Sequence, residues 1–213
     1  MAIALDHFLI ITSHGAPEAD LLANIGLVEG TSNDHPGQGT ANRRFFFSNW
    51  GLELGYIRDA EEALNGKASG LRIVERAADH NASPFGLIVH RTTDDTDDPF
   101  PGWHYYPEYF SADKYFVVGE NADIIEEPLC ICMPIMAPER PVQPPQAESF
   151  ANVTELIVSV PVEKPSNVLQ SISECDGVSL RTGEPHCMEI VFKDGVEGHS
   201  KDLNPDLPLV IRW

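Results

Sequence analysis

The stretch from His35 to Ile57 carries one acidic residue, Glu53, within an otherwise apolar strand. Because side chains alternate across a strand, Gly51, Glu53 and Gly55 are expected on the same face, so the carboxyl group has no bulky neighbours there. A carboxylate that leaves water needs a partner or a shifted pKa. The pattern therefore fits a metal ligand or a general base, and it fits a solvated strand face equally well.

Further groups in this stretch could bind a substrate. His35 begins a glycine-rich turn, where small residues let backbone N–H groups approach an anion or a carbonyl oxygen, although a plain turn has the same composition. One of two consecutive arginines, Arg43 or Arg44, could hold a carboxylate in a bidentate contact. Alternation sends these two side chains to opposite faces, and the sequence does not say which one faces inward.

The densest aromatic cluster is the segment WHYYPEYF, residues 103–110. Aromatic side chains line most small-molecule pockets, so the cluster could close a cavity. An insertion that packs on the sheet would have the same composition, and packing is the interpretation that we favour. The preceding acidic run, TDDTDD, lacks the spacing and the glutamate of an EF-hand and is interpreted as a solvated loop.

Composition and charge limit the partners. The 213 residues suffice for one large domain or two small ones, and 42% hydrophobic with 22% charged residues is typical of a globular protein. A net charge of −19 argues against nucleic acid or an anionic membrane as a partner. The first residues have neither the basic region nor the apolar core of a secretion signal, and no apolar run is long enough to span a membrane. A cytoplasmic location and reduced cysteines are therefore expected.

The elements that must position these groups recur in the two halves of the chain. The expected strands are 5–12, the hairpin 35–57, 84–92, 129–133, 153–161, 187–192 and 207–213. In each half the first strand precedes a short helix that ends at a glycine, Gly26 or Gly177. A proline-rich stretch, APERPVQPPQ, separates the halves and is interpreted as a linker. The matching order predicts a duplicated unit.

The sequence resembles a glyoxalase-like protein of the vicinal oxygen chelate superfamily. The resemblance rests on LDHFLI at the start, HPGQGTANRRFFF followed by LELGYI, SPFGLIVHRT in the middle and DLPLVIRW at the end, and it covers most of the chain. It implies an α+β fold in which two βαβββ modules form curved mixed sheets around a shared cavity. The modules would span residues 1–92 and 151–213, with an insertion and the proline-rich linker at 93–150.

The resemblance also implies a candidate metal site. Superfamily members that bind a divalent metal often ligate it with a histidine or glutamine on the first strand of each module and a glutamate on the last. Carried over by position, His7 and Glu53 are the metal ligands of the first module, and Glu155 takes the place of His7 in the second. The final strand, PLVIRW, has no acidic residue, so the divalent ion, of unknown identity, would need a further ligand such as a loop histidine. No nucleotide cofactor is implied.

By this resemblance the protein is a small-molecule enzyme of lyase, isomerase or dioxygenase type that acts on an oxygenated or carbonyl substrate. Glu53 and Glu155 are the expected catalytic residues. The residues expected to bind substrate are His35, Gly39, Thr40, Asn42, Arg44, His90 and Trp103. The missing final-strand glutamate favours an alternative, a metal-free binding or sequestering protein of the bleomycin-resistance type. A structural or partner-binding role ranks third, and a homodimer is compatible with all three.

Overall fold

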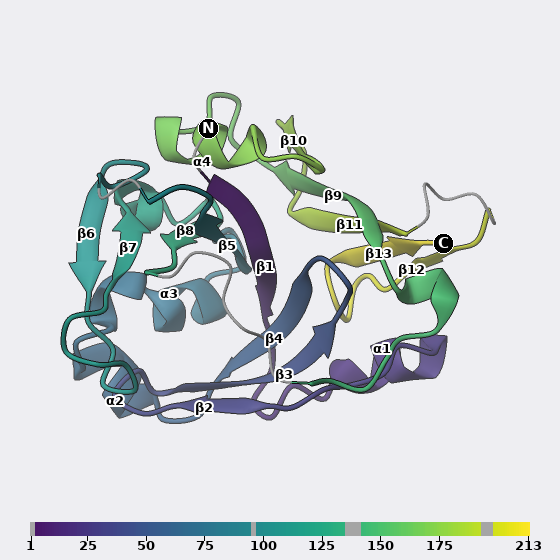
Figure 1. Cartoon of the computed structure of the whole chain (residues 1–213), viewed down its shortest axis with the longest axis horizontal. Coiled ribbons are helices and arrows are strands. Elements are labelled where there is room, and N and C mark those ends of the chain that lie inside the picture. Colours follow the sequence, from purple (N-terminus) through teal and green to yellow (C-terminus); the bar gives the residue numbers. More distant parts are fainter. Residues whose placement is uncertain (1–2, 95–96, 135–141, 193–197) are drawn as a thin grey trace.

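Two β-sheets, packed face to face, form the protein in the computed structural model, which describes residues 3–94, 97–134, 142–192 and 198–213. The first sheet has eight strands and curls into a half-barrel, and the second has five strands (Figure 1). Helices are few and short, so the class is mixed α+β. None of the described helices is long and apolar enough to cross a membrane.

The strands of the first sheet are β1 (Ile3–Ile11), β2 (Asn33–His35), β3 (Thr40–Phe46), β4 (Gly51–Ile57), β5 (Phe85–Arg91), β6 (Gly102–Tyr105), β7 (Phe116–Gly119) and β8 (Leu129–Cys132). Those of the second sheet are β9 (Val153–Val160), β10 (Val178–Thr182), β11 (Cys187–Phe192), β12 (Ser200–Asp202) and β13 (Leu209–Arg212). The helices are α1 (Ala19–Ile25), α2 (Ala60–Asn65), α3 (Ile73–Ala78) and α4 (Asn167–Ser173), with 3-10 turns η1 (Ser69–Leu71), η2 (Glu120–Asp123) and η3 (Glu148–Phe150). These elements confirm the strands and helices expected near both ends of the chain.

The first sheet has two halves with the same strand order. Its order is β2-β3-β4-β1-β5-β8-β7-β6, and the halves meet where β1 and β5 pair in antiparallel fashion. β1 lies parallel to β4, and β5 lies parallel to β8. The second sheet, with the order β10-β9-β11-β13-β12, repeats this arrangement around the antiparallel pair β9 and β11.

The middle of the chain has a different role from the one that the sequence predicts. An insertion is expected over residues 93–150, whereas β6, β7 and β8 of the first sheet lie in this range. β8 matches the strand expected at 129–133, whereas β6 and β7 were not predicted, because four residues leave little room for a recognisable alternating pattern. Part of the expected proline-rich linker, residues 137–141, lies outside the described residues, and residues 142–146 have no regular structure.

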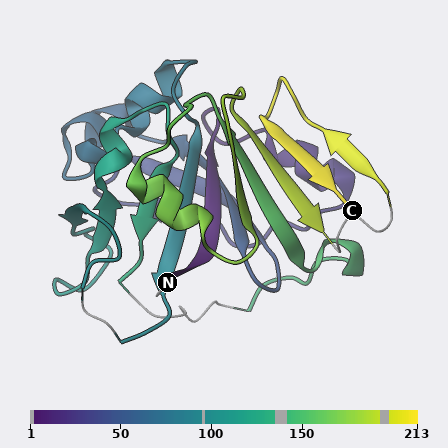
Figure 2. The ribbon, with the colours of Figure 1, turned by 90° about the horizontal axis from the view of Figure 1, so that it is seen from above.

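The main hydrophobic core lies between the two sheets. It includes Phe8 and Ile10 of β1 together with Leu156 and Val158 of β9, all fully buried. Helix α4 closes one end of this layer, where it contacts β1 and β8 of the first sheet and β10 of the second (Figure 2). Because the second sheet occupies the outer face of the half-barrel, the inner face remains available for a site.

A β-bulge decides which face of β1 carries His7. Simple alternation predicts that Leu5 and His7 share a face, but these residues pair with adjacent residues of β5, so Asp6 is an extra residue in the strand. Leu5 therefore belongs to the core with Phe8 and Ile10. His7 points to the opposite, inner face. The prediction that Leu5 and His7 lie together was wrong, because a bulge reverses the alternation and leaves no signal in the residue pattern.

Candidate functional site

A cavity of about 420 Å³ lies on the inner face of the half-barrel. One wall comes from β1, β3 and β4 and the other from β5, β8 and the segment between β6 and β7. Its polar lining consists of His7, Asn33, Asp34, His35, Gln38, Thr40, Asn42, Arg44 and Glu53. The resemblance implied a cavity between residues 1–92 and 151–213, but the lining residues run from His7 to Met133. Both walls belong to one sheet because β5 to β8 supply the second wall.

His7 and Glu53, which the resemblance placed together, both line this cavity. The Nε2 atom of His7 lies 3.9 Å from Oε1 of Glu53, and the two side chains are 19% and 17% exposed. The other ring nitrogen, Nδ1, lies 2.7 Å from Oδ1 of Asp6, which is buried. A carboxylate at Nδ1 fixes the orientation of the ring and favours the tautomer in which Nε2 carries a lone pair. Asp6 therefore aims the reactive nitrogen of His7 toward Glu53.

The glycines on either side of Glu53 face residues of β1. A Cβ atom at Gly51 would lie 3.4 Å from the Cβ of His7, and one at Gly55 would lie 3.9 Å from a methyl group of Leu9. Both distances are ordinary van der Waals contacts. Alternation thus correctly predicted that Glu53 has no bulky neighbours on its own strand.

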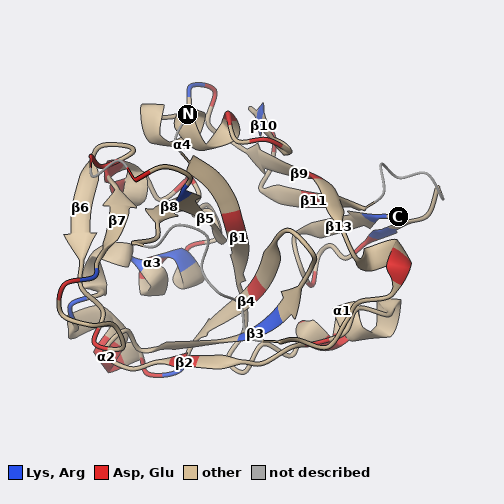
Figure 3. Cartoon of the chain, in the orientation of Figure 1, with Lys and Arg blue, Asp and Glu red and all other residues tan. Residues whose placement is uncertain are grey.

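Glu53 is held by two side chains of β3. Asn42 donates a hydrogen bond of 2.9 Å to Oε2, and a terminal nitrogen of Arg44 lies 3.9 Å from Oε1. The acidic positions of β1 and β4 and the basic stretch of β3 lie close together in the ribbon (Figure 3). Arg44 itself donates to the carbonyl oxygen and the hydroxyl of Thr31 at 2.6 and 3.1 Å. Burial lowers the pKa of Arg44, and the Glu53 carboxylate opposes this shift.

Of the two consecutive arginines, Arg44 faces the cavity. Arg44 lines the cavity, whereas Arg43 points to the opposite face and donates to Glu29 at 2.6 and 2.8 Å and to Asp20 at 3.0 Å. The hydrogen bonds to Glu29 raise the pKa of Arg43. One arginine therefore anchors the strand from outside, and the other supplies the cation of the cavity.

His35 adds a partly buried imidazole to the same cavity. Its Nδ1 lies 3.0 Å from the Thr40 hydroxyl, which also accepts a hydrogen bond of 2.9 Å from Gln38. Burial lowers the pKa of His35 below 6.5, and the nearby Glu53 opposes this shift. The ring is therefore neutral at pH 7.

The lowered pKa of His35 predicts a pH dependence of stability. The unfolded protein takes up a proton at His35 near pH 6.5, whereas the folded protein does so only at a lower pH. The contribution of His35 to the free energy of unfolding is therefore fully present above pH 6.5 and is lost as the pH falls below 6.5. In His35→Gln the slope of unfolding free energy against pH should be smaller between pH 5 and 6.5, measured by urea denaturation. His80→Gln, whose ring is 91% exposed, is the control. An unchanged slope in His35→Gln would contradict the assignment.

Some residues of the aromatic cluster line the cavity, and others pack in a hydrophobic cluster away from it. Tyr109 and Phe110 line the cavity, and the Tyr109 hydroxyl donates a hydrogen bond of 3.2 Å to Gln38 on the opposite wall. The rings of Tyr109 and His35 lie 5.5 Å apart. Burial raises the pKa of Tyr109, so its hydroxyl stays protonated. Trp103, by contrast, packs in a separate hydrophobic cluster against Gly70.

Four of the predicted site residues do not line the cavity. Trp103 packs as described above, and His90 lies beside Asp6, with its Nδ1 3.7 Å from a carboxylate oxygen. Gly39 turns the chain between β2 and β3 with a φ of +72°. Glu155 lies on β9 of the second sheet, where it accepts a hydrogen bond of 2.6 Å from Ser179. Asp6 and Gln38 are not among the residues predicted from the sequence, and Tyr109 was predicted only as a member of the aromatic cluster, for which packing was the favoured interpretation.

The donors around His7 and Glu53 do not fit a divalent metal ion. On the opposite wall, Ile88 of β5 pairs with His7 in register, and Ile131 of β8 pairs with Ile88, so apolar side chains stand where further ligands would be needed. The cation of Arg44 already lies beside Glu53. Across residues 3–94, 97–134, 142–192 and 198–213, no group of three or more His, Cys, Asp or Glu side chains is arranged to hold a metal.

Comparisons with known proteins describe the fold alone. No protein-family model matches the sequence, and no curated protein matches it. A solved structure described as a hypothetical protein from Staphylococcus aureus is similar, with a TM-score of 0.56 and 11% sequence identity. The similarity covers 99% of this chain and 98% of that one. The two-sheet arrangement as a whole is therefore shared with a natural protein.

Proposed function

We propose that the protein is a glyoxalase-like enzyme that transfers a proton to or from a small carbonyl substrate in the cavity, without a metal. The resemblance of the sequence to the vicinal oxygen chelate superfamily supports the class. The order of β1, α1, β2, β3 and β4, with β1 beside β4, supports a βαβββ reading of the first half of the sheet. The proposal leaves Glu155 without a catalytic role.

The single observation that carries this proposal is the pair of His7 and Glu53, 3.9 Å apart in the cavity. Two groups that each accept or release a proton can remove one from a carbon next to a carbonyl group and return it elsewhere. Asn42 fixes one oxygen of Glu53, which leaves Oε1 facing His7. Arg44 can stabilise the negative charge that develops on the substrate oxygen.

Exchange of carbon-bound protons tests this proposal without knowledge of the full reaction. We would incubate the protein with a panel of aldehydes, ketones and 2-oxo acids in D2O containing EDTA, and follow the α-proton signals by NMR. We expect protein-dependent loss of these signals for at least one compound. Exchange that requires an added metal would refute the metal-independent step, and no exchange across the panel would count against the enzyme.

A binding protein without chemistry is the second candidate. It is favoured by the apolar wall of Ile88 and Ile131 and by the aromatic side chains over the opening, which suit a partly aromatic ligand. Such a ligand would raise the melting temperature because it binds only the folded state. A compound that raises the melting temperature but shows no proton exchange would favour this function over the enzyme.

A further inference from the structure

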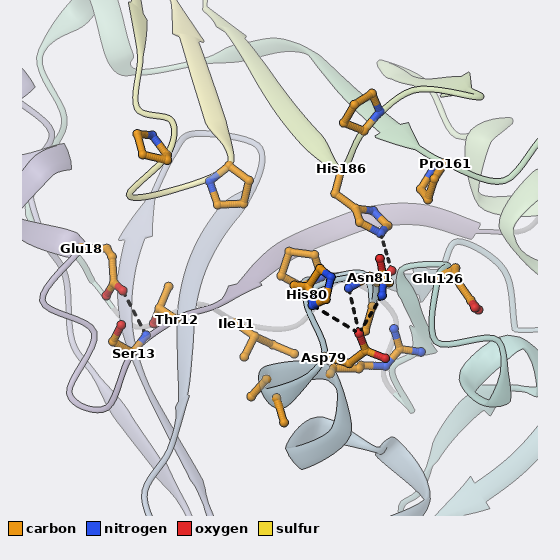
Figure 4. A pocket seen from close by; sticks show the side chains of 18 residues that line it. Ile11, Thr12, Ser13, Glu18, Asp79, His80, Asn81, Glu126, Pro161 and His186 are labelled. Carbon is orange, nitrogen blue, oxygen red and sulfur yellow. Dashed lines mark hydrogen bonds and ion pairs between the residues drawn. The ribbon is translucent and has the colours of Figure 1, made fainter.

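Two parts of the chain beyond β8 approach the first sheet. One lines a cleft of about 880 Å³ between the sheets, where Nε2 of His186 lies 3.1 Å from the carbonyl oxygen of Asn81 (Figure 4). Among the described residues, this cleft shares only Ile11 with the cavity on the inner face of the half-barrel. The other part is residues 142–146 of the connection between the sheets, and it binds the residue that holds Arg44.

Arg44 owes its orientation in the cavity to Thr31. Its Nε donates a hydrogen bond of 2.6 Å to the carbonyl oxygen of Thr31, and its Nη2 donates one of 3.1 Å to the Thr31 hydroxyl. Two hydrogen bonds to one residue fix the plane of the guanidinium. They leave the third nitrogen, Nη1, at 3.9 Å from Oε1 of Glu53. Because this distance is too long for a hydrogen bond, Thr31 rather than Glu53 sets the position of the cation.

Thr31 is exposed and lies outside the strands, and Gln143 supports it. The backbone N–H of Thr31 donates a hydrogen bond of 3.0 Å to Oε1 of Gln143, and Nε2 of Gln143 donates one of 3.0 Å to the Thr31 hydroxyl. The two residues are 112 positions apart in the sequence. A chain of hydrogen bonds therefore runs from the connection between the sheets through Thr31 to Arg44.

Gln143 lies in close contact with the residue before Thr31. A Cβ atom at Gly30 would lie 2.5 Å from Oε1 of Gln143 and 2.5 Å from the ring of Phe46, so only a glycine leaves room for the glutamine there. The N–H of Gly30 also donates a hydrogen bond of 2.8 Å to the carbonyl oxygen of Arg44, which fastens this segment to β3. The fit indicates a specific contact rather than a side chain that rests loosely on the surface.

Gln146 makes a matching contact with a different residue. Its Oε1 accepts a hydrogen bond of 2.8 Å from the N–H of Val28, and its Nε2 donates one of 2.6 Å to the carbonyl oxygen of Val28. In an extended proline-rich chain with three residues per turn, side chains three positions apart face the same way. Gln143 and Gln146 thus both face the edge of the first sheet, whereas Val142 is 99% exposed. The hydrogen bonds of Gln146 fasten the connection to Val28 and not to Thr31.

We propose that Thr31 and Gln143 are positioning residues for Arg44 in the proton transfer. The inference rests on the proposed function, in which Arg44 stabilises the negative charge that develops on the substrate oxygen. A long side chain that is already held in place loses no conformational freedom when this charge develops. The connection between the two sheets, which the sequence indicates only as a linker, therefore supports the cavity.

The Nε–H proton of Arg44 tests the positioning without any substrate. Its signal is assigned in heteronuclear NMR spectra by its absence in Arg44→Lys. In Gln143→Ala this proton should exchange with water about tenfold or more faster than in the wild type, because Thr31, which carries its acceptor, has lost two hydrogen bonds. Gln146→Ala loses a matching pair of hydrogen bonds at another residue and should change the exchange rate by no more than about twofold. Unchanged exchange in Gln143→Ala, or an equal increase in Gln146→Ala, would overturn the proposal.

Two variants of Thr31 test the middle of this chain of hydrogen bonds. Thr31→Ser keeps the carbonyl and the hydroxyl oxygen, so the Nε–H proton of Arg44 should exchange as in the wild type. Thr31→Val keeps the shape but removes the hydroxyl that accepts from Gln143 and Arg44, so exchange should be about fivefold or more faster. Thermal unfolding of each variant shows whether the fold is retained. Equal exchange in the two variants would count against the proposal.

A substrate reaction distinguishes a failure of this inference from a failure of the proposed function. The probes are pyruvate and dihydroxyacetone in D2O with EDTA. Gln143→Ala should lower kcat for exchange of their α-protons about tenfold and leave KM nearly unchanged, because Arg44 acts on charge that develops in the transition state. Gln146→Ala should keep the wild-type kcat. A lower kcat without faster Nε–H exchange at Arg44 would refute the positioning. Faster Nε–H exchange with an unchanged kcat, or no α-proton exchange with either probe, would refute the proposed function and leave the positioning to the NMR result.

Discussion

Glu53→Gln is expected to reduce the protein-dependent proton exchange by at least about 100-fold, because general acid–base catalysis contributes about 100- to 10,000-fold and an amide cannot accept the proton. The substitution keeps the shape of the side chain. Its amide oxygen can still accept the hydrogen bond from Asn42, so the melting temperature should change little. NMR exchange rates measured in D2O with EDTA, together with thermal unfolding, give both quantities.

Two further variants sharpen this result. Glu61→Gln makes the same chemical change at an exposed position of α2 and should exchange protons at the wild-type rate. Asp6→Asn leaves His7 in place but removes the carboxylate at Nδ1, so it should slow the exchange less than Glu53→Gln and change its pH profile. Exchange in Glu53→Gln at the wild-type rate would show that the carboxylate has no part in the proton transfer.

Those features of the site that could be predicted from the sequence follow from residues that are neighbours in the chain. The hairpin of β3 and β4 follows from two alternating runs around a turn, and alternation placed Glu53 beside glycines and separated Arg43 from Arg44. The end of α1 follows from Gly26, whose φ of +110° suits a residue without a side chain. Such signals need no knowledge of the remaining chain.

The opposite wall of the cavity could not be predicted in the same way. It depends on which strands pair, and Ile88 and Ile131 show only apolar character in the sequence, as any core residue does. The contact between Tyr109 and Gln38 joins residues 71 positions apart. Glu155 was matched to His7 correctly within its strand. It follows Thr154, the extra residue of β9, as His7 follows Asp6, the extra residue of β1. Strand pairing, which the residue pattern does not reveal, places β9 in the other sheet.

The second large effect is expected on stability, from Glu127→Gln. Glu127 is 1% exposed, and its carboxylate accepts hydrogen bonds from the backbone N–H and the hydroxyl of Ser166, both at 2.6 Å, and from Asn121 at 3.1 Å. All three partners donate, so an amide must turn its own NH2 group toward one of them. Ser166 also caps α4, which joins the two sheets. We expect unfolding free energy to fall by roughly 2–4 kcal/mol, measured by urea denaturation.

The neighbouring residue provides a matched control for this prediction. Glu126 is exposed, so Glu126→Gln removes the same charge from the same loop without breaking a buried hydrogen bond, and it should change the unfolding free energy by less than about 0.5 kcal/mol. The difference between the two variants therefore measures the contacts of Glu127 rather than the net charge. If both variants unfold at the wild-type urea concentration, the carboxylate does not fasten α4 to the first sheet. In that case other contacts hold the two sheets together, among them the hydrophobic core and the hydrogen bonds between Asn49 and Val153.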